Sequence, residues 1–176
     1  SVTGVQTCAL PISYRAAADR YWTPVEVATV AATWLAEGGA ARILDVGSGV
    51  GKFCIVGART TGASFVGLEH RRPLVEAARE AAERAGVAEK TLFVNAEASL
   101  PLMRGYMAMY LFNPFGENLY AKDKALDQTV ELGHRRYNRD VGLVEEVLRL
   151  LPFGGRVATY HGFGGRLPDT MVLERQ

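Results

Sequence analysis

Short apolar runs alternate along the chain with longer stretches in which apolar residues recur every three or four positions. The apolar runs predict strands at residues 42–46, 64–68, 91–94, 107–112 and 156–160. Helical spacing between and around them predicts helices at about residues 23–35, 50–61, 73–85 and 143–151. Because strands alternate with helices, we expect an α/β fold with a doubly wound, mainly parallel sheet.

The first predicted helix has a start signal and a stop signal. Thr23 is suited to cap the helix, Pro24 to occupy its first position, and Glu26 to lie three residues after the cap. Gly38 and Gly39 follow the last apolar residues and are expected to end it.

The two ends of the chain differ from the middle. Residues 2–12 show neither helical nor strand periodicity and read like a translated sequencing adapter, so we expect residues 1–13 to be a non-native segment. The domain is expected over residues 14–176. Residues 170–175 are interpreted as a sixth strand, after which the chain stops. We therefore expect the domain to be incomplete at its C-terminus.

Composition excludes several classes of partner. The formal net charge is +1, so no global field attracts the protein to nucleic acid or to an anionic membrane. No apolar run approaches the ~18 residues that a membrane helix needs. Cys8 lies in the adapter-like segment and leaves Cys54 as the domain's one thiol, which is typical of a reducing compartment. We expect a cytoplasmic protein with no membrane partner and no strong nucleic-acid signal.

The loop after the first predicted strand carries three alternating glycines, Gly47, Gly49 and Gly51. Glycine has no Cβ, so such a loop can turn sharply and bring its amides against a ligand at the start of a helix. An ordinary strand-to-helix turn does not require three glycines in this spacing. The loop therefore predicts a binding site.

Glu69 follows the second predicted strand, 22 residues after Gly47. A carboxylate at the tip of the neighbouring strand can accept hydrogen bonds from both hydroxyls of a ribose. The alternative is a solvated strand end. Together with the glycine loop, Glu69 favours a nucleoside-binding site.

The glycine spacing discriminates between nucleotide-binding motifs. The dinucleotide motif G-x-G-x-x-G would place its third glycine at Lys52. A phosphate-binding G-x-x-x-x-G-K-[ST] loop would need glycine at Val46 and a hydroxyl at Phe53. Neither motif fits, so the spacing disfavours a triphosphate site and an NAD-dependent oxidoreductase.

The pattern that remains, D-x-G-x-G-x-G at residues 45–51, resembles that of the class I S-adenosylmethionine-dependent methyltransferases. The resemblance runs from about Tyr21 to the C-terminus, and its further elements follow in the family's order: Glu69, Asn95-Ala96, Asn113-Pro114-Phe115 and residues 151–157. It implies a Rossmann-like methyltransferase fold, whose sheet usually has seven strands, and S-adenosylmethionine as cofactor.

The resemblance also implies which residues bind the cofactor. Asp45 would orient the ammonium group of the methionine part, and Glu69 would bind the ribose. Asn95 stands where the family often has an acid beside the adenine. The full set is Asp45, Gly47, Ser48, Gly49, Gly51, Glu69, Asn95 and Ala96.

The segment Asn113-Pro114-Phe115 is informative about the reaction. It resembles the N-P-P-[YF] motif of amine-directed methyltransferases, shortened by one proline. In that motif the asparagine side chain and a proline carbonyl accept hydrogen bonds from the target nitrogen, and the aromatic ring packs on the substrate. We therefore expect Asn113, Pro114 and Phe115 to be the catalytic residues. The alternative is an Asn-Pro turn that leaves a strand.

Three other features have two interpretations each, and a fourth has one. His161 is either a general base in the same pocket or a structural residue. The basic, aromatic-bearing stretch at residues 134–139 either binds an anionic substrate or nucleic acid, or forms a solvated surface. Tyr21 and Trp22 either cover the cofactor or staple the first helix. Cys54 is expected to be a small core residue, because metal-ligand spacing is absent from the sequence.

The resulting hypothesis is an enzyme that transfers a methyl group from S-adenosylmethionine to an unidentified acceptor. An amine nitrogen is one candidate, and a small molecule, a protein amine and an RNA base all remain open. The alternatives are a catalytically inactive nucleoside-binding module of the same fold and, further away, an NAD-dependent oxidoreductase. Because the sulfonium is already activated, such catalysis needs mainly alignment and a dry pocket.

Overall fold

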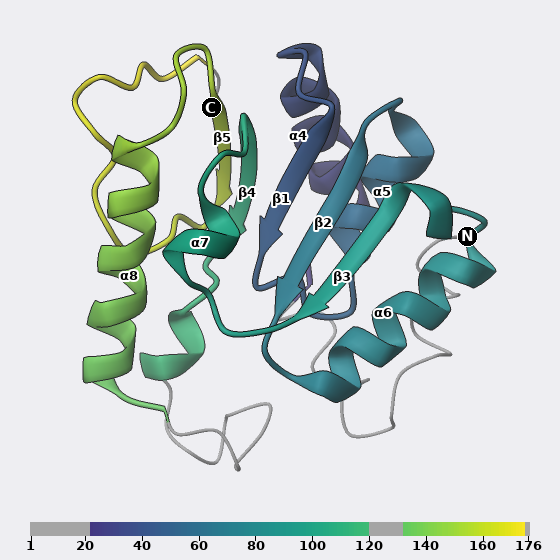
Figure 1. Ribbon diagram of the computed structural model, residues 1–176, viewed down its shortest axis with the longest axis horizontal. Coiled ribbons are helices and arrows are strands. Elements are labelled where there is room, and N and C mark those ends of the chain that lie inside the picture. The colour runs from purple at the N-terminus through teal and green to yellow at the C-terminus, as the bar shows by residue number, and fades with distance from the viewer. Residues whose placement is uncertain (1–21, 120–131, 175–176) are drawn as a thin grey trace.

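The computed structural model describes residues 22–119 and 132–174. Five strands in these ranges form one sheet in the order β3-β2-β1-β4-β5, with every neighbouring pair parallel (Figure 1). The strands are β1 (Arg42–Val46), β2 (Ser64–Glu69), β3 (Thr91–Asn95), β4 (Ala108–Phe112) and β5 (Arg156–Tyr160). The predicted fold class is confirmed, and each predicted strand agrees with the structure to within one residue at either end.

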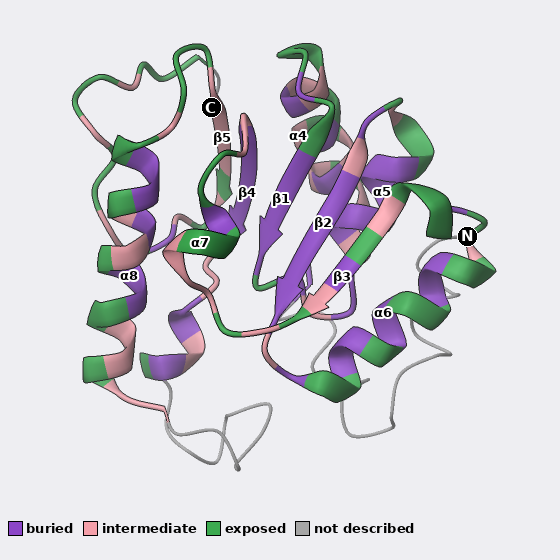
Figure 2. Cartoon of the chain, viewed as in Figure 1, coloured by how far each residue is buried: buried purple, intermediate pink, exposed green. Residues whose placement is uncertain are grey.

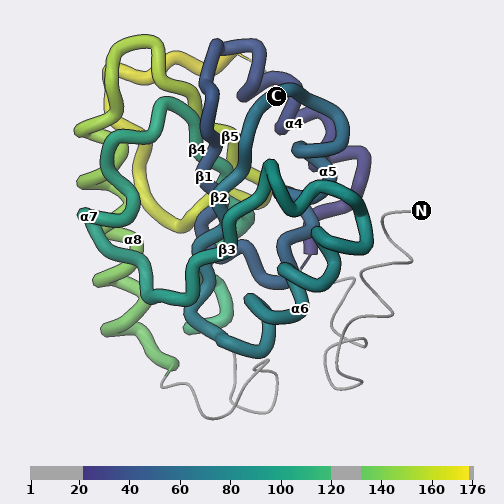
Figure 3. Tube along the Cα trace, turned by 45° about the vertical axis from the view of Figure 1, so that its right-hand side comes forward, coloured from purple at the N-terminus to yellow at the C-terminus, as the bar shows by residue number. Residues whose placement is uncertain are grey.

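Helices cover both faces of this sheet, as Figure 3 shows from a second direction. One face carries α4 (Val25–Glu37), α5 (Lys52–Thr60) and α6 (Arg72–Arg84). The other face carries α7 (Leu100–Met103) and α8 (His134–Arg149). Two short 3-10 helices, η1 (Ala88–Lys90) and η2 (Gly116–Leu119), lie in the connections. No helix within the described ranges is both long and apolar enough to span a membrane.

The central strands are buried on both faces, as the burial colours of Figure 2 show. Successive side chains of a strand point to opposite faces, so Ile43 packs among residues of α4, α5 and α6, whereas Leu44 and Val46 pack with α8. Phe53 of α5 stacks on Tyr110 of β4, with ring centroids 3.9 Å apart. This stack fixes the helix that follows the glycine loop against the middle of the sheet.

Thr23 does not cap the first helix, so that prediction was wrong. The helix begins at Val25, and no side chain caps it. The Thr23 hydroxyl instead lies 3.0 Å from the hydroxyl of Tyr110, and both residues are buried. Burial decides the difference, because a buried phenol hydroxyl needs a partner more than a helix end near solvent does.

Two further expectations need correction. Residues 170–174 form irregular chain instead of a sixth strand, and Val172 and Leu173 stay exposed without packing on the sheet. Helix α8 begins at His134, well before the predicted residue 143. The first two turns of α8 consist mainly of basic and polar residues, so they lack the apolar spacing from which a helix is predicted.

The packing of α5 on β2 generates a prediction about Gly57. A Cβ at this buried helical position would overlap the Phe65 ring. We expect Gly57→Ala to lower the free energy of unfolding by ~1–3 kcal/mol, although alanine favours helices, because overpacking a core outweighs helix propensity. Gly62→Ala is the matched control, since no atom lies within 4 Å of its Cβ position. Urea unfolding measures both, and a stabilised Gly57→Ala variant would contradict the packing.

Candidate functional site

A pocket opens at the edge of the sheet where β1, β2, β3 and β4 end. Parallel strands bring their carboxyl ends to the same edge, so the loops that follow them meet there. The start of α8 completes the wall. The predicted site residues on this wall are Gly47, Gly49, Glu69, Ala96, Asn113, Pro114 and Phe115.

The glycine loop lies against the end of β2. The amides of Gly47 and Ser48 both donate hydrogen bonds to the Leu68 carbonyl, at 2.9 and 3.0 Å. Gly47 has a φ of 75°, which residues other than glycine rarely adopt. A Cβ there would also lie 3.1 Å from the Cβ of Pro114. Glycine at this position therefore lets the loops after β1 and β4 approach each other.

Glu69 presents a buried carboxylate to the pocket, with 4% of the residue exposed. The carboxylate accepts hydrogen bonds from the Gly49 amide at 3.1 Å and from the Arg71 amide at 2.9 Å. Desolvation by burial raises the pKa of Glu69, while the hydrogen bond and the charge of Arg71 act in the opposite direction. The side chain is thus held in one place by donors from both loops.

Asp45 lies behind the glycine loop and not on the pocket wall. Its carboxylate accepts a hydrogen bond from the Cys54 thiol, whose sulfur lies 3.6 Å away. Burial raises the pKa of Asp45 to about 7, and the nearby charge of Glu69 acts in the same direction. Cys54 itself is fully buried, as expected of a small core residue.

Three other predicted cofactor residues also lie off the pocket wall. The buried Ser48 hydroxyl faces Gly67 and has no hydrogen-bond partner among the described residues. Gly51 is the N-cap residue just before α5 and lies next to the Phe93 ring. The side-chain Nδ2 of Asn95 donates to the backbone carbonyls of Glu69 and His70, at 3.1 and 2.9 Å. These residues support the loops, and direct contact between them and a cofactor stays a prediction.

The Asn113-Pro114-Phe115 segment leaves β4 along the pocket wall. Asn113 has a φ of 35°, an uncommon conformation for a residue other than glycine. Its amide donates to the Gly162 carbonyl at 2.9 Å, and its side chain lies so close to Gly116 that a Cβ there would overlap it. Phe115 packs into the core between the sheet and α8. The backbone of this segment is therefore fixed from both sides.

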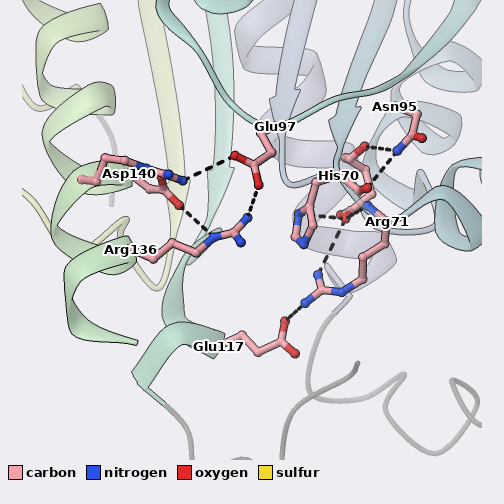
Figure 4. A network of polar contacts seen from close by, with 9 residues as sticks. His70, Arg71, Asn95, Glu97, Glu117, Arg136 and Asp140 are labelled. Atoms are coloured by element: carbon pink, nitrogen blue, oxygen red, sulfur yellow. Dashed lines mark hydrogen bonds and ion pairs between the residues drawn. The ribbon is translucent and has the colours of Figure 1, made fainter. Parts of the chain in front are cut away.

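Sequence reasoning missed a group of polar and charged residues on the same wall, most of which Figure 4 labels. The Arg71 guanidinium forms an ion pair with Glu117 and so connects the end of β2 to η2. Position was an available signal for three of them, since His70, Arg71 and Glu97 lie one or two residues after a strand end, whereas the other three lie in η2 and α8. The missed residues are His70, Arg71, Glu97, Glu117, Asn118 and Asp140.

The structure favours a role at the pocket for Trp22 but not for His161. Trp22 is buried and lines the pocket beside Gly49, so it covers the glycine loop. It also packs with Val50 and Leu74, which anchors the chain that leads into α4. Tyr21 lies outside the described residues. His161 is exposed beside Tyr160 and is not on the pocket wall, which disfavours its interpretation as a general base. The described residues contain no cluster suited to a metal ion.

The environment of Asp45 predicts how stability depends on pH. Its pKa is about 7 in the folded state, whereas the ordinary value, which applies to the unfolded chain, is 3.8. Between pH 3.8 and pH 7, unfolding therefore releases a proton from Asp45. The free energy of unfolding should therefore fall as pH rises from ~4 to ~7, by on the order of 3–4 kcal/mol from this group. Asp45→Asn should flatten the profile and gain stability relative to wild type at pH 8.

Urea unfolding at pH 5, 6, 7 and 8 measures this effect. Glu89→Gln, which removes one exposed carboxylate from η1, is the control and should leave the slope unchanged. Parallel profiles for wild type and Asp45→Asn would contradict the assignment.

Comparison with solved structures finds similar chains. An S-adenosylmethionine-dependent methyltransferase from Geobacter sulfurreducens, in complex with S-adenosyl-L-homocysteine, matches 90% of this chain with a TM-score of 0.54 and 20% identity. The CcbJ methyltransferase from Streptomyces caelestis matches 78% of this chain, with a TM-score of 0.55 and 21% identity. An RNA methyltransferase from Salinibacter ruber, also with S-adenosyl-L-homocysteine, matches 55% with a TM-score of 0.49 and 30% identity.

The chain spans 53%, 52% and 63% of the lengths of these three structures, respectively. No curated protein matches it. The first two matches show the Rossmann-like methyltransferase fold that the sequence motifs implied. Residues 6–115 match the model of a methyltransferase family, and that range includes β1 to β4 with the glycine loop and Asn113-Pro114-Phe115. The chain belongs to the protein-L-isoaspartate(D-aspartate) O-methyltransferase family.

Proposed function

We propose that this domain transfers a methyl group from S-adenosylmethionine to a carboxylate oxygen of an acceptor. One observation carries the proposal: the glycine loop and Glu69, on the cofactor side, share a pocket with Asn113-Pro114-Phe115. The cofactor is the methyl donor that the motif order implies, in a family of methyltransferases. The carboxylate acceptor is supported by the family's description as an isoaspartate O-methyltransferase.

The residues of the pocket fit a nucleoside sulfonium. Gly47 and Gly49 bring backbone to the wall without side chains, and a Cβ on Gly47 would fill space that separates it from Pro114. Glu69 supplies a carboxylate that can accept from ribose hydroxyls. Apolar side chains next to it provide surfaces for a base: Trp22, Leu68, Leu74 and Ala96.

When bound, the cofactor supplies a methyl group already activated by the positive sulfur. The chain's own residues then have to align the acceptor and exclude water. Pro114 and Phe115, held by packing on either side, form the rigid wall against which the acceptor would lie. A carboxylate is ionised at neutral pH and attacks without losing a proton, so this chemistry does not need His161 as a base.

Nitrogen is a second candidate acceptor, because Asn113-Pro114-Phe115 resembles the motif of amine-directed enzymes. The Asn113 side chain and the Pro114 carbonyl are acceptors suited to an N–H group. Methyl esters and methylamines differ in stability to mild base, which gives a direct way to separate the two candidates.

The test uses the full chain with radiolabelled S-adenosylmethionine and three acceptors: an L-isoaspartyl peptide, the matching aspartyl peptide and a lysine peptide. We expect label on the isoaspartyl peptide that is released as methanol in mild base. Base-stable label on the lysine peptide would favour nitrogen. Thermal shift with S-adenosyl-L-homocysteine and no transfer to any acceptor or cell extract would favour an inactive binding module, and a shift with NAD alone would contradict the proposal.

Two variants separate the cofactor side from the acceptor side. Asn113→Ala should leave the dissociation constant for S-adenosyl-L-homocysteine within about threefold of wild type and lower kcat/KM by ~10²-fold, equivalent to ~2.7 kcal/mol. Glu69→Gln should weaken that binding by ~10-fold or more, because the ribose loses a charged acceptor. Glu76→Gln, an exposed change on α6, is the control for charge.

Calorimetric titration and transfer kinetics measure the two effects. Equal losses of binding and turnover in Asn113→Ala would make Asn113 a cofactor or folding residue. Unchanged turnover in Asn113→Ala would show that the Asn113-Pro114-Phe115 segment is only a turn that leaves β4 and has no catalytic role.

A further inference from the structure

Helix α8 begins with a run of basic residues that opposes its own dipole. His134, Arg135, Arg136 and Arg139 occupy its first turns, which contain no acidic residue before Asp140, and no side chain caps its start. The N-terminal end of a helix carries a partial positive charge, so cations there are unfavourable. A local arrangement that costs stability is expected where function requires it. The same end of α8 forms part of the pocket wall.

Two of these arginines are held in place by a buried carboxylate. Asp140, with 5% of the residue exposed, accepts a hydrogen bond from Arg139 Nε at 2.8 Å, and its other oxygen lies 3.6 Å from Arg136 Nε. All three residues line the pocket. Asp140 is buried against both guanidiniums, so it stays in place as their fixed partner.

The second carboxylate on these arginines is different in kind. Glu97 comes from the loop after β3, its side chain is 57% exposed, and it reaches across to both guanidiniums (Figure 4). Its oxygens lie 3.1 Å from Arg136 Nη2 and 3.6 Å from Arg139 Nη2. Exposed ion pairs contribute little free energy, so another carboxylate can replace Glu97 at small cost.

We propose that Arg136 and Arg139, organised by Asp140, bind an anionic group of the methyl acceptor, and that Glu97 occupies this place until the acceptor enters. Four ion pairs make one fork, in which two guanidiniums are shared between a buried carboxylate and an exposed carboxylate. The inference rests on the proposed function, because it assigns to the acceptor the part of the pocket wall formed by α8. Guanidiniums suit carboxylate and phosphate alike, so the ligand chemistry is that of a small oxyanion.

The chain's electrostatics favour a single small anion over a polyanion. The fork carries two cations that are already opposed by two carboxylates, and the formal net charge of the chain is +1. Nucleic-acid binding draws on many phosphate contacts at once. Replacing the exposed Glu97 carboxylate by one carboxylate of a ligand needs no large positive surface.

The test measures binding without turnover, in protein saturated with S-adenosyl-L-homocysteine. Succinate is the carboxylate probe and inorganic phosphate the phosphate probe, each titrated at constant ionic strength and followed by amide NMR shifts. We expect succinate to bind, Glu97→Gln to bind it about twofold to fivefold more tightly, and Arg136→Gln to bind it at least threefold more weakly. Phosphate binding tighter than succinate binding would assign the fork to a phosphorylated acceptor instead.

Arg135→Gln is the matched control, since Arg135 is an exposed neighbour on the same helix turn that does not line the pocket. Glu97→Gln changes an exposed side chain, so the fold should persist and its gain of affinity cannot arise from unfolding. Equal effects of Arg135→Gln and Arg136→Gln, unchanged affinity in Glu97→Gln, or no binding of either probe would overturn the proposal. If one of these results is found and the protein still methylates the isoaspartyl peptide, the role of the fork is wrong but the proposed function stands.

Discussion

Two hydrogen bonds from one loop to one carbonyl organise the site. The amides of Gly47 and Ser48 both donate to Leu68 at the end of β2, which ties the loop after β1 to the neighbouring strand. Because Glu69 follows Leu68 directly, its carboxylate is brought within hydrogen-bond distance of the Gly49 amide. The cofactor side of the pocket therefore depends on the parallel pairing of β1 and β2 more than on any single side chain.

The same arrangement places two carboxylates where water is scarce. Asp45 and Glu69 are both buried, and burial raises the pKa of each. Glu69 gains hydrogen bonds from two amides, whereas Asp45 has the Cys54 thiol, a weaker donor. Ionisation of either carboxylate therefore opposes folding, and the Asp45 pKa of about 7 places its own effect near neutral pH. A site that holds buried acids in this way gives up stability for a fixed geometry.

The wall near η2 and α8, where the acceptor is proposed to bind, is held by ion pairs instead of loop amides. Arg71 joins the end of β2 to η2 through Glu117, and Glu97 joins the loop after β3 to α8 through Arg136. Each pair crosses the pocket edge between segments that are far apart in sequence. The exposed Glu97 can exchange with a charged ligand, whereas the largely buried Arg71–Glu117 pair and the loop amides stay in the protein's own contacts.

The sequence alone determined the strands, the sheet class and the residues that lie directly after each strand. Apolar runs and glycines are local signals, and parallel pairing guarantees that strand ends such as Glu69 and Asn113 meet at one edge. The tertiary structure decided what depends on contacts between distant segments. Thr23 bonds Tyr110 in place of capping a helix, and Asp140 lies buried behind two arginines. Neither result has a periodic signal, because each is set by which groups are buried together after the chain has folded.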